Sequence, residues 1–144
     1  MTNELERNDD SAAATATLEV VAPGALATVQ DLGRPGWRRF GVPRSGALDP
    51  ALLRVANVLA GNDAAHPVLE CFGAGPTLKA VDAPVCIGLA GDFSPLLTLH
   101  GGERKQLDSW RSVTLEPGDT RARQRVGVLA RAHGFTRGSR AARR

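Results

Sequence analysis

Only one stretch of this chain has the apolar spacing of an amphipathic helix, and the other apolar residues fall mostly in short runs between glycines and prolines. Asp49 is a favourable capping residue, Pro50 suits the first helical position, and Gly61 ends the pattern. The apolar residues between them recur at helical spacing: Leu52, Val55, Ala56 and Leu59. A helix is therefore predicted here, with Arg54 and Asn57 on its other side. A single helix among many short apolar runs indicates a mostly-β fold.

The short apolar runs predict strands. They cover residues 18–21, 26–30, 68–72, 77–80, 85–90, 96–99 and 112–116. Turns are predicted at Pro23-Gly24, Gly101-Gly102 and Pro117-Gly118. In 85–90 large side chains alternate with small ones, which is typical of a strand that is buried on both faces in a tapering barrel.

The 144 residues suffice for one domain, and the charge is divided unevenly along them. Residues 1–16 are polar and acidic without periodicity, which predicts a disordered leader before a domain over 17–120. Residues 121–144 hold eight arginines and no acid, whereas 1–120 hold ten basic and fifteen acidic residues. The basic tail also lacks strand alternation, so we predict an out-of-frame or disordered segment. A genuine basic arm for RNA or an acidic partner is the alternative.

Several kinds of function are not expected from this composition. No apolar run has the roughly 18 residues of a membrane span, and the acidic N-terminal segment does not resemble a signal peptide. We therefore predict a cytoplasmic protein without a membrane partner. Cys71 and Cys86 have no ligand spacing with the three histidines, so no metal site is predicted. The aromatics and arginines of 37–40 are typical of single-stranded nucleic-acid binding, but in an acidic body we favour aromatics that anchor a loop and predict no nucleic-acid partner.

Polar residues gather around a loop over 32–46 that is rich in glycine and proline. They are Gln30, Asp31, Arg34, Ser45 and Asp49. A carboxylate, an amide and a guanidinium at the mouth of a barrel can bind a small amide or carboxylate ligand. In the alternative, Asp31 caps its turn, Asp49 caps the helix, and Arg34 pairs with one of them.

Glu70 is a carboxylate in a predicted strand, where Val68 and Phe72 share its face. Desolvation disfavours the charged form of such a group, which makes Glu70 a candidate acid or base. A solvated face or an arginine partner is the open alternative. The catalytic residues stay unassigned, with Asp31 and Glu70 as candidates.

Four motifs follow one another between residues 28 and 78. They are TVQDLGRPGW from Thr28, GVPRSGALD from Gly41, the pairs Ala56-Asn57 and Gly61-Asn62, and Leu69-Glu70 leading to GPTL from Gly75. Together they resemble the biotin-dependent carboxyltransferase family, which includes the C subunit of 5-oxoprolinase (KipA), allophanate hydrolase subunit 2 and part of urea carboxylase. The resemblance covers about residues 18–120 and implies a cyclophilin-like β-barrel. The barrel is expected to be incomplete, because family members continue through further strands.

The resemblance also implies a subunit of an amide-processing complex. In the oxoprolinase system such a subunit acts with a second, KipI-like barrel subunit and an amidohydrolase subunit in the ATP-dependent opening of 5-oxoproline to glutamate. In urea carboxylase the related region transfers a carboxyl group from carboxybiotin to urea. We thus expect a small amide substrate, ATP used by the complex, biotin in some members, and no cofactor bound by this chain alone, which is expected to be inactive in isolation. The substrate-binding candidates are Gln30, Asp31, Arg34, Ser45, Asp49 and Asn57. A non-catalytic binding or regulatory module is the alternative.

Overall fold

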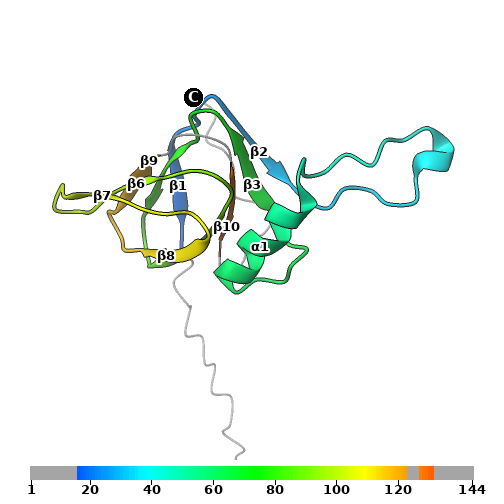
Figure 1. Cartoon of the computed structure of the whole chain (residues 1–144). Helices are drawn as coiled ribbons and strands as arrows, with labels where there is room; N and C mark the ends of the chain where they lie inside the picture. The colour runs from blue at the N-terminus through cyan, green and yellow to red at the C-terminus, as the bar shows by residue number, and fades with distance from the viewer. Residues whose placement is uncertain (1–15, 123–126, 132–144) are drawn as a thin grey trace, which may run out of the picture.

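The computed structural model describes residues 16–122 and 127–131. In this part of the chain it has one α-helix, α1 (Pro50–Ala60), and one short 3-10 helix, η1 (Arg38–Phe40). The strands are β1 (Leu18–Ala22), β2 (Leu26–Gln30), β3 (Val68–Phe72), β4 (Thr77–Ala80), β5 (Val85–Ala90), β6 (Leu96–Thr98), β7 (Arg104–Gln106), β8 (Arg111–Leu115), β9 (Thr120–Ala122) and β10 (Gly127–Arg131). They form two antiparallel sheets, sheet A in the order β1-β4-β9-β6-β7 and sheet B in the order β2-β3-β10-β5-β8 (Figure 1).

The sheets and the helix form three layers. A core between the sheets contains side chains from both, among them Leu78 of β4, Leu97 of β6 and Ile87 of β5. A second core lies on the other face of sheet B, where Leu53 of α1 packs near Val68 of β3. Sheet B is therefore covered by sheet A on one face and by α1 on the other.

This layering explains the alternation of side-chain size in β5. The large residues Val85, Ile87 and Leu89 belong to the core between the sheets. Gly88 faces α1 so closely that an added Cβ atom would clash with the Ala56 carbonyl oxygen. The prediction that this strand is buried on both faces is confirmed, and the small residues are needed because a helix lies directly on them.

The predicted class, mostly β with one helix and an incomplete barrel, is confirmed. In the described residues β1 and β7 are the edges of sheet A, β2 and β8 are the edges of sheet B, and the sheets do not join into a closed barrel. Large apolar side chains on β1 and β2 remain more than half exposed: Val20, Val21, Leu26 and Val29.

Three strands lie where none was predicted, namely β7, β9 and β10. The expectation that strands stop before Arg121 is corrected, because β10 pairs with β3 on one side and with β5 on the other. Such a strand is positioned by backbone hydrogen bonds to two neighbours, so it does not depend on alternating side chains. Residues 1–15 of the predicted leader (1–16) and residues 123–126 and 132–144 of the predicted tail (121–144) lie outside the described residues. The predicted domain limits at 17 and 120 stay predictions.

The helix has the predicted ends but a different buried face. Asp49 Oδ1 accepts the N–H groups of Ala51 at 2.9 Å and Leu52 at 3.1 Å, and Gly61 ends the helix with φ of 76°. The buried side chains are those of Leu53, Ala56, Asn57 and Ala60, one position beyond the predicted stripe. Asn57 tolerates burial because its side-chain amide donates to the His66 carbonyl at 2.7 Å and accepts from Asn62 at 3.1 Å. No helix in the described part of the chain has the length and apolar character needed to cross a membrane.

Candidate functional site

Between β2 and α1 the chain leaves the body as a long loop whose two halves run side by side, drawn in cyan in Figure 1. We call residues 32–48 the arm, and residues 37–41 its tip. The tip is formed by η1 and ends at Gly41, which adopts a left-handed φ of 76°. The arm includes the loop that the sequence singled out as rich in glycine and proline. It brings the two ends of that loop together beside β3 and the start of α1.

The base of the arm is held by close backbone contact between its two halves. The Arg34 N–H donates to the Arg44 carbonyl at 2.8 Å, and the Ala47 N–H donates to the Asp31 carbonyl at 2.8 Å. A Cβ atom at Gly46 would lie 2.5 Å from the Gly33 nitrogen. Both of these glycines also have positive φ, 74° and 87° along the chain, so side chains are excluded there by conformation and by space.

The two predicted catalytic candidates anchor this base. Asp31 Oδ1 accepts the Gly33 N–H at 2.7 Å. This carboxylate therefore caps its own turn, which is the alternative role considered from the sequence. Glu70 on β3 is 7% exposed, and its two carboxylate oxygens share the Leu48 N–H at 3.0 and 3.2 Å. A buried carboxylate that accepts a backbone N–H fixes the point where the arm returns to α1.

Arginines dominate the polar side chains of the arm. Arg34 Nη2 donates to Ser45 Oγ at 3.3 Å, in place of the aspartate pairing considered from the sequence. Arg44 Nε donates to the Leu32 carbonyl at 3.2 Å. A hollow of about 280 Å³ lies in the arm, lined by Arg34, Pro35, Gly36, Arg38 and Arg44. Two of its guanidinium groups are thus oriented by hydrogen bonds.

The charge of the arm suits an anionic ligand. Residues 32–48 contain Arg34, Arg38, Arg39 and Arg44 and no aspartate or glutamate. One guanidinium group can bind two oxygens of a carboxylate or a phosphate at the same time. Guanidinium groups in general carry a positive charge in the physiological pH range. The hollow therefore fits a carboxylate or a similar small anion better than a neutral ligand.

The structure separates the remaining site predictions. Arg34 and Ser45 meet in the arm, whereas Gln30 donates to Thr28 on its own strand at 3.1 Å. The carboxylate of Asp49 is used by the helix cap and the amide of Asn57 is fully buried. Arg38 and Arg44 were not among the predicted site residues. The signal that could have identified them is the presence of four arginines and no acidic residue between residues 32 and 48.

The aromatic side chains of the tip do not anchor the arm to the body. Trp37 is 54% exposed and Phe40 is 63% exposed, and η1 contains no buried residue. The expectation that these aromatics bury themselves as loop anchors is therefore wrong. The chain between residues 32 and 48 is fixed at its base, and the aromatic rings are left facing outward at its far end.

The described residues hold no group of three or more His, Cys, Asp and Glu side chains that could bind a metal ion. The N-terminus of α1 is also unsuited to phosphate, because the Asp49 carboxylate already accepts two of its free N–H groups. The arginine-lined hollow is thus a place in the described structure where a charged small ligand can be accommodated.

Comparison with known sequences identifies relatives over much of the chain. The family model described as "Carboxyltransferase domain, subdomain A and B" matches residues 40–133. The C subunit of the 5-oxoprolinase of Escherichia coli (strain K12) is 51% identical over 53 residues, which cover 37% of this chain and 17% of the relative. The urea amidolyase of Saccharomyces cerevisiae is 36% identical over 105 residues, 70% of this chain and 6% of the relative. The chain thus spans less than a fifth of either relative.

Solved structures give the same grouping. The crystal structure of TTHA0988 superimposes with a TM-score of 0.71 at 35% sequence identity, over 83% of this chain and 24% of the other. The crystal structure of the Kluyveromyces lactis urea amidolyase gives a TM-score of 0.70 at 32% identity, over 82% of this chain and 7% of the other. At this identity and overlap the likeness extends to both sequence and fold.

Proposed function

The chain belongs to the carboxyltransferase domain family, and from this premise we propose that it contributes one domain to an amide-processing complex of the 5-oxoprolinase type. The arm binds the carboxylate of the substrate in this proposal. The observation that carries it is the hollow lined by Arg34, Arg38 and Arg44, in a segment that contains no acid.

The charge of the arm favours one substrate class over the other. The relatives include a 5-oxoprolinase subunit and urea amidolyases. 5-Oxoproline carries a carboxylate at neutral pH, whereas urea has no charge. Three arginines around one hollow repel one another until an anion is bound, so they favour the anionic amide.

The proposal gives the remaining candidates positioning roles. Asp31 and Glu70 hold the base of the arm by accepting backbone N–H groups, and Ser45 orients the Arg34 guanidinium. A direct catalytic role of Asp31 or Glu70 stays a prediction, as does substrate contact by Gln30, Asp49 or Asn57. We expect the reacting groups to be completed by partner subunits, namely a second barrel subunit and an amidohydrolase subunit.

The implied cofactors fit this arm unequally. ATP, which the complex is expected to use, carries phosphates that the arginines of the arm would attract by charge alone, and the capped start of α1 adds no phosphate site. The carboxylate of a carboxylated biotin fits the arginine-lined hollow by charge. The biotin ring without its carboxyl group is neutral and gains nothing from the arginines. The arginines could then hold the carboxylate of either molecule, and the proposed binding of an anionic amide does not depend on biotin.

The test is substrate dependence of the assembled complex. The chain is co-expressed with the other 5-oxoprolinase subunits, and ATP-dependent glutamate formation from 5-oxoproline is measured. Arg44→Gln is expected to raise KM by at least about tenfold and to leave kcat within about threefold, because a carboxylate contact is made before and during the reaction. Arg54→Gln is the matched control, because Arg54 is an exposed arginine on α1.

Three outcomes separate the levels of the proposal. An unchanged KM in Arg44→Gln refutes carboxylate binding by the arm. Turnover of urea without turnover of 5-oxoproline refutes the substrate class. Failure of the chain to associate with any of the subunits refutes membership of the complex, although the family remains that of the carboxyltransferase domain.

A further inference from the structure

The tip of the arm is a preformed pair of exposed aromatic rings. The centroids of Trp37 and Phe40 lie 5.7 Å apart with an interplanar angle of 48°, and the Arg39 guanidinium carbon lies 4.7 Å from the Phe40 centroid. The backbone fixes this pair, because the Phe40 N–H donates to the Trp37 carbonyl at 2.9 Å and the Gly41 N–H donates to the Arg38 carbonyl at 3.0 Å. Little conformational entropy is therefore lost when a partner binds the pair.

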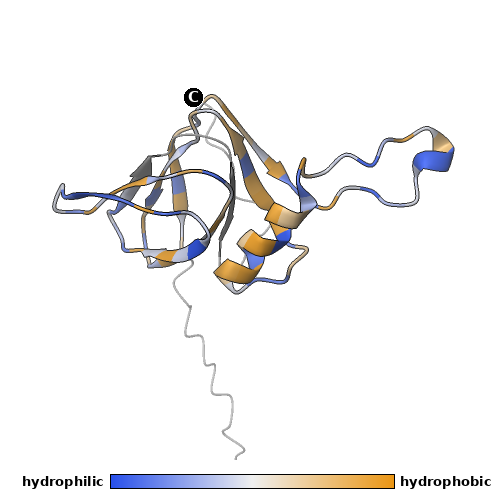
Figure 2. Ribbon diagram, in the orientation of Figure 1, coloured by the Kyte–Doolittle hydropathy of each residue, from blue (hydrophilic) through white to orange (hydrophobic). Residues whose placement is uncertain are grey.

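Folding of this chain does not account for the pair. Both rings are more than half exposed, and they lie at the end of a projection that stands clear of the body (Figure 1). Figure 2 shows hydrophilic and hydrophobic residues next to one another at the end of the arm. Exposed tryptophan and arginine in one small cluster are the residue types that dominate protein–protein binding energy.

The charge of the tip specifies the surface that it fits. The arm holds four of the ten basic residues in 1–120, and thirteen of the fifteen acidic residues in that range lie in neither the arm nor its two flanking positions. Arg38 and Arg39 lie between the two aromatic residues in the chain, so a docking surface needs apolar walls for the rings and carboxylates beside them. A basic surface would repel these guanidinium groups.

We propose that the tip of the arm, residues 37–41, docks into an apolar pocket with an acidic rim on a partner protein. The occupant is one of the other subunits of the complex, so this inference rests on the proposed function. The hollow lined by Arg34, Arg38 and Arg44 binds the small ligand. The base of the arm sets its direction, and the rings of Trp37 and Phe40 provide the anchor. Docking would bring the partner protein next to the arginine-lined hollow.

The test compares tip variants with matched variants elsewhere on the assembled complex. The dissociation constant is measured by titrating the purified chain with the co-expressed 5-oxoprolinase subunits. Trp37→Ala is expected to weaken binding by at least about thirtyfold, as for a buried aromatic anchor. Trp110→Ala is the control, since Trp110 is 55% exposed and lies outside the arm. Its binding should stay within about threefold of the unaltered chain.

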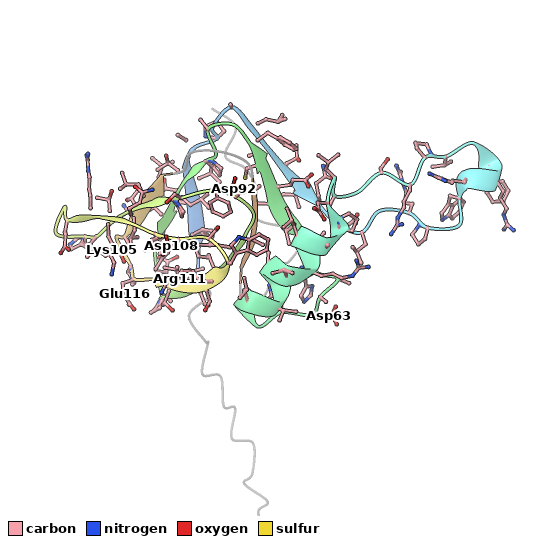
Figure 3. The ribbon with its side chains drawn as sticks, viewed as in Figure 1. Asp63, Asp92, Lys105, Asp108, Arg111 and Glu116 are labelled. Carbon is pink, nitrogen blue, oxygen red and sulfur yellow. The ribbon has the colours of Figure 1, made fainter. Side chains whose placement is uncertain are left out.

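A second pair of variants tests the acidic rim. Arg39→Glu is expected to slow association by at least about tenfold at low salt and to reduce the salt dependence of the association rate. Lys105→Glu makes the same change in net charge on the side of the body away from the arm (Figure 3). It should alter the rate by less than about threefold. Equal urea midpoints for all four variants establish that the body is folded.

Each remaining outcome overturns the inference. If the unaltered chain assembles and Trp37→Ala assembles equally well, the docking site is elsewhere and the proposed function stands. If the unaltered chain does not assemble, both fail. If the tip variants abolish self-association or binding of a single-stranded oligonucleotide and leave binding to the other subunits intact, the tip serves a second copy or a nucleic acid and the acidic pocket is refuted.

Discussion

The buried carboxylate of Glu70 gives the sharpest test of how the arm is held. Glu70→Ala removes the only acceptor that the described part of the chain shows for the Leu48 N–H, whose bond is partly buried. An unpaired N–H in such a place costs about 1–3 kcal/mol, and hydrogen bonds to charged groups contribute about 1.5–3 kcal/mol. We expect the free energy of unfolding to fall by about 2–3 kcal/mol. Glu70→Gln keeps one oxygen acceptor and should cost about 1 kcal/mol.

Urea unfolding followed by circular dichroism measures both changes. With a slope of about 2 kcal/mol per molar urea, Glu70→Ala should lower the midpoint by about 1 M and Glu70→Gln by about half as much. Glu103→Ala is the control, because Glu103 is an exposed carboxylate in the turn before β7. Surface substitutions of this kind stay within about 0.5 kcal/mol.

The same variants distinguish positioning from catalysis. A positioning carboxylate predicts that Glu70→Gln retains most of the activity of the assembled complex. If Glu70→Gln abolishes turnover and leaves the urea midpoint unchanged, the carboxylate takes part in the chemistry and the positioning role is refuted. If Glu70→Ala unfolds at the same urea concentration as Glu103→Ala, the hydrogen bond to Leu48 contributes nothing and the account of the arm base is wrong.

Two further predictions concern the body. Gly88→Ala should destabilise the chain by about 3 kcal/mol, because the new Cβ would overlap the Ala56 carbonyl, whereas Gly101→Ala, with open space around it, should change the urea midpoint little. Asp119 is 5% exposed and accepts two backbone N–H groups, so Asp119→Ala should cost about 2–4 kcal/mol by the same measurement. The exposed Asp82→Ala is its control, and equal midpoints for Asp119→Ala and Asp82→Ala would refute the assignment.

Local signals in the sequence were sufficient for most of the fold. The cap at Asp49, the end at Gly61 and seven of the strands depend on nearby residues, and all are present. The strand β10 depends on two partners far away in the sequence, β3 and β5, so no local pattern reveals it. The buried face of α1 was predicted one position off, because Asn57 finds hydrogen-bond partners that hydrophobicity does not register.

The loop that carries the candidate site was predictable from the sequence, whereas the hydrogen-bond partners of its side chains were not. The turn and capping aspartates and the Gly-Pro loop were visible in the sequence, and the structure brings Arg34 and Ser45 together. The partner of Glu70 was not visible, because Leu48 offers only a backbone N–H that any residue would offer. Side-chain chemistry can be inferred from residue types, whereas a backbone partner is identified only when the chain path is known.

The arm has two parts that differ in what stabilises them. At its base, glycines in close contact and two anchored carboxylates compensate for ordering the chain. At its tip no residue of η1 is buried, although each ordered residue costs about 1–2 kcal/mol of backbone entropy. A short turn joining the two halves of the base would keep the same backbone hydrogen bonds at the base and would order fewer residues. The extended tip therefore stabilises the fold no more than a shorter loop would. Burial of its aromatic rings against a partner would offset the backbone entropy that is lost in ordering the tip.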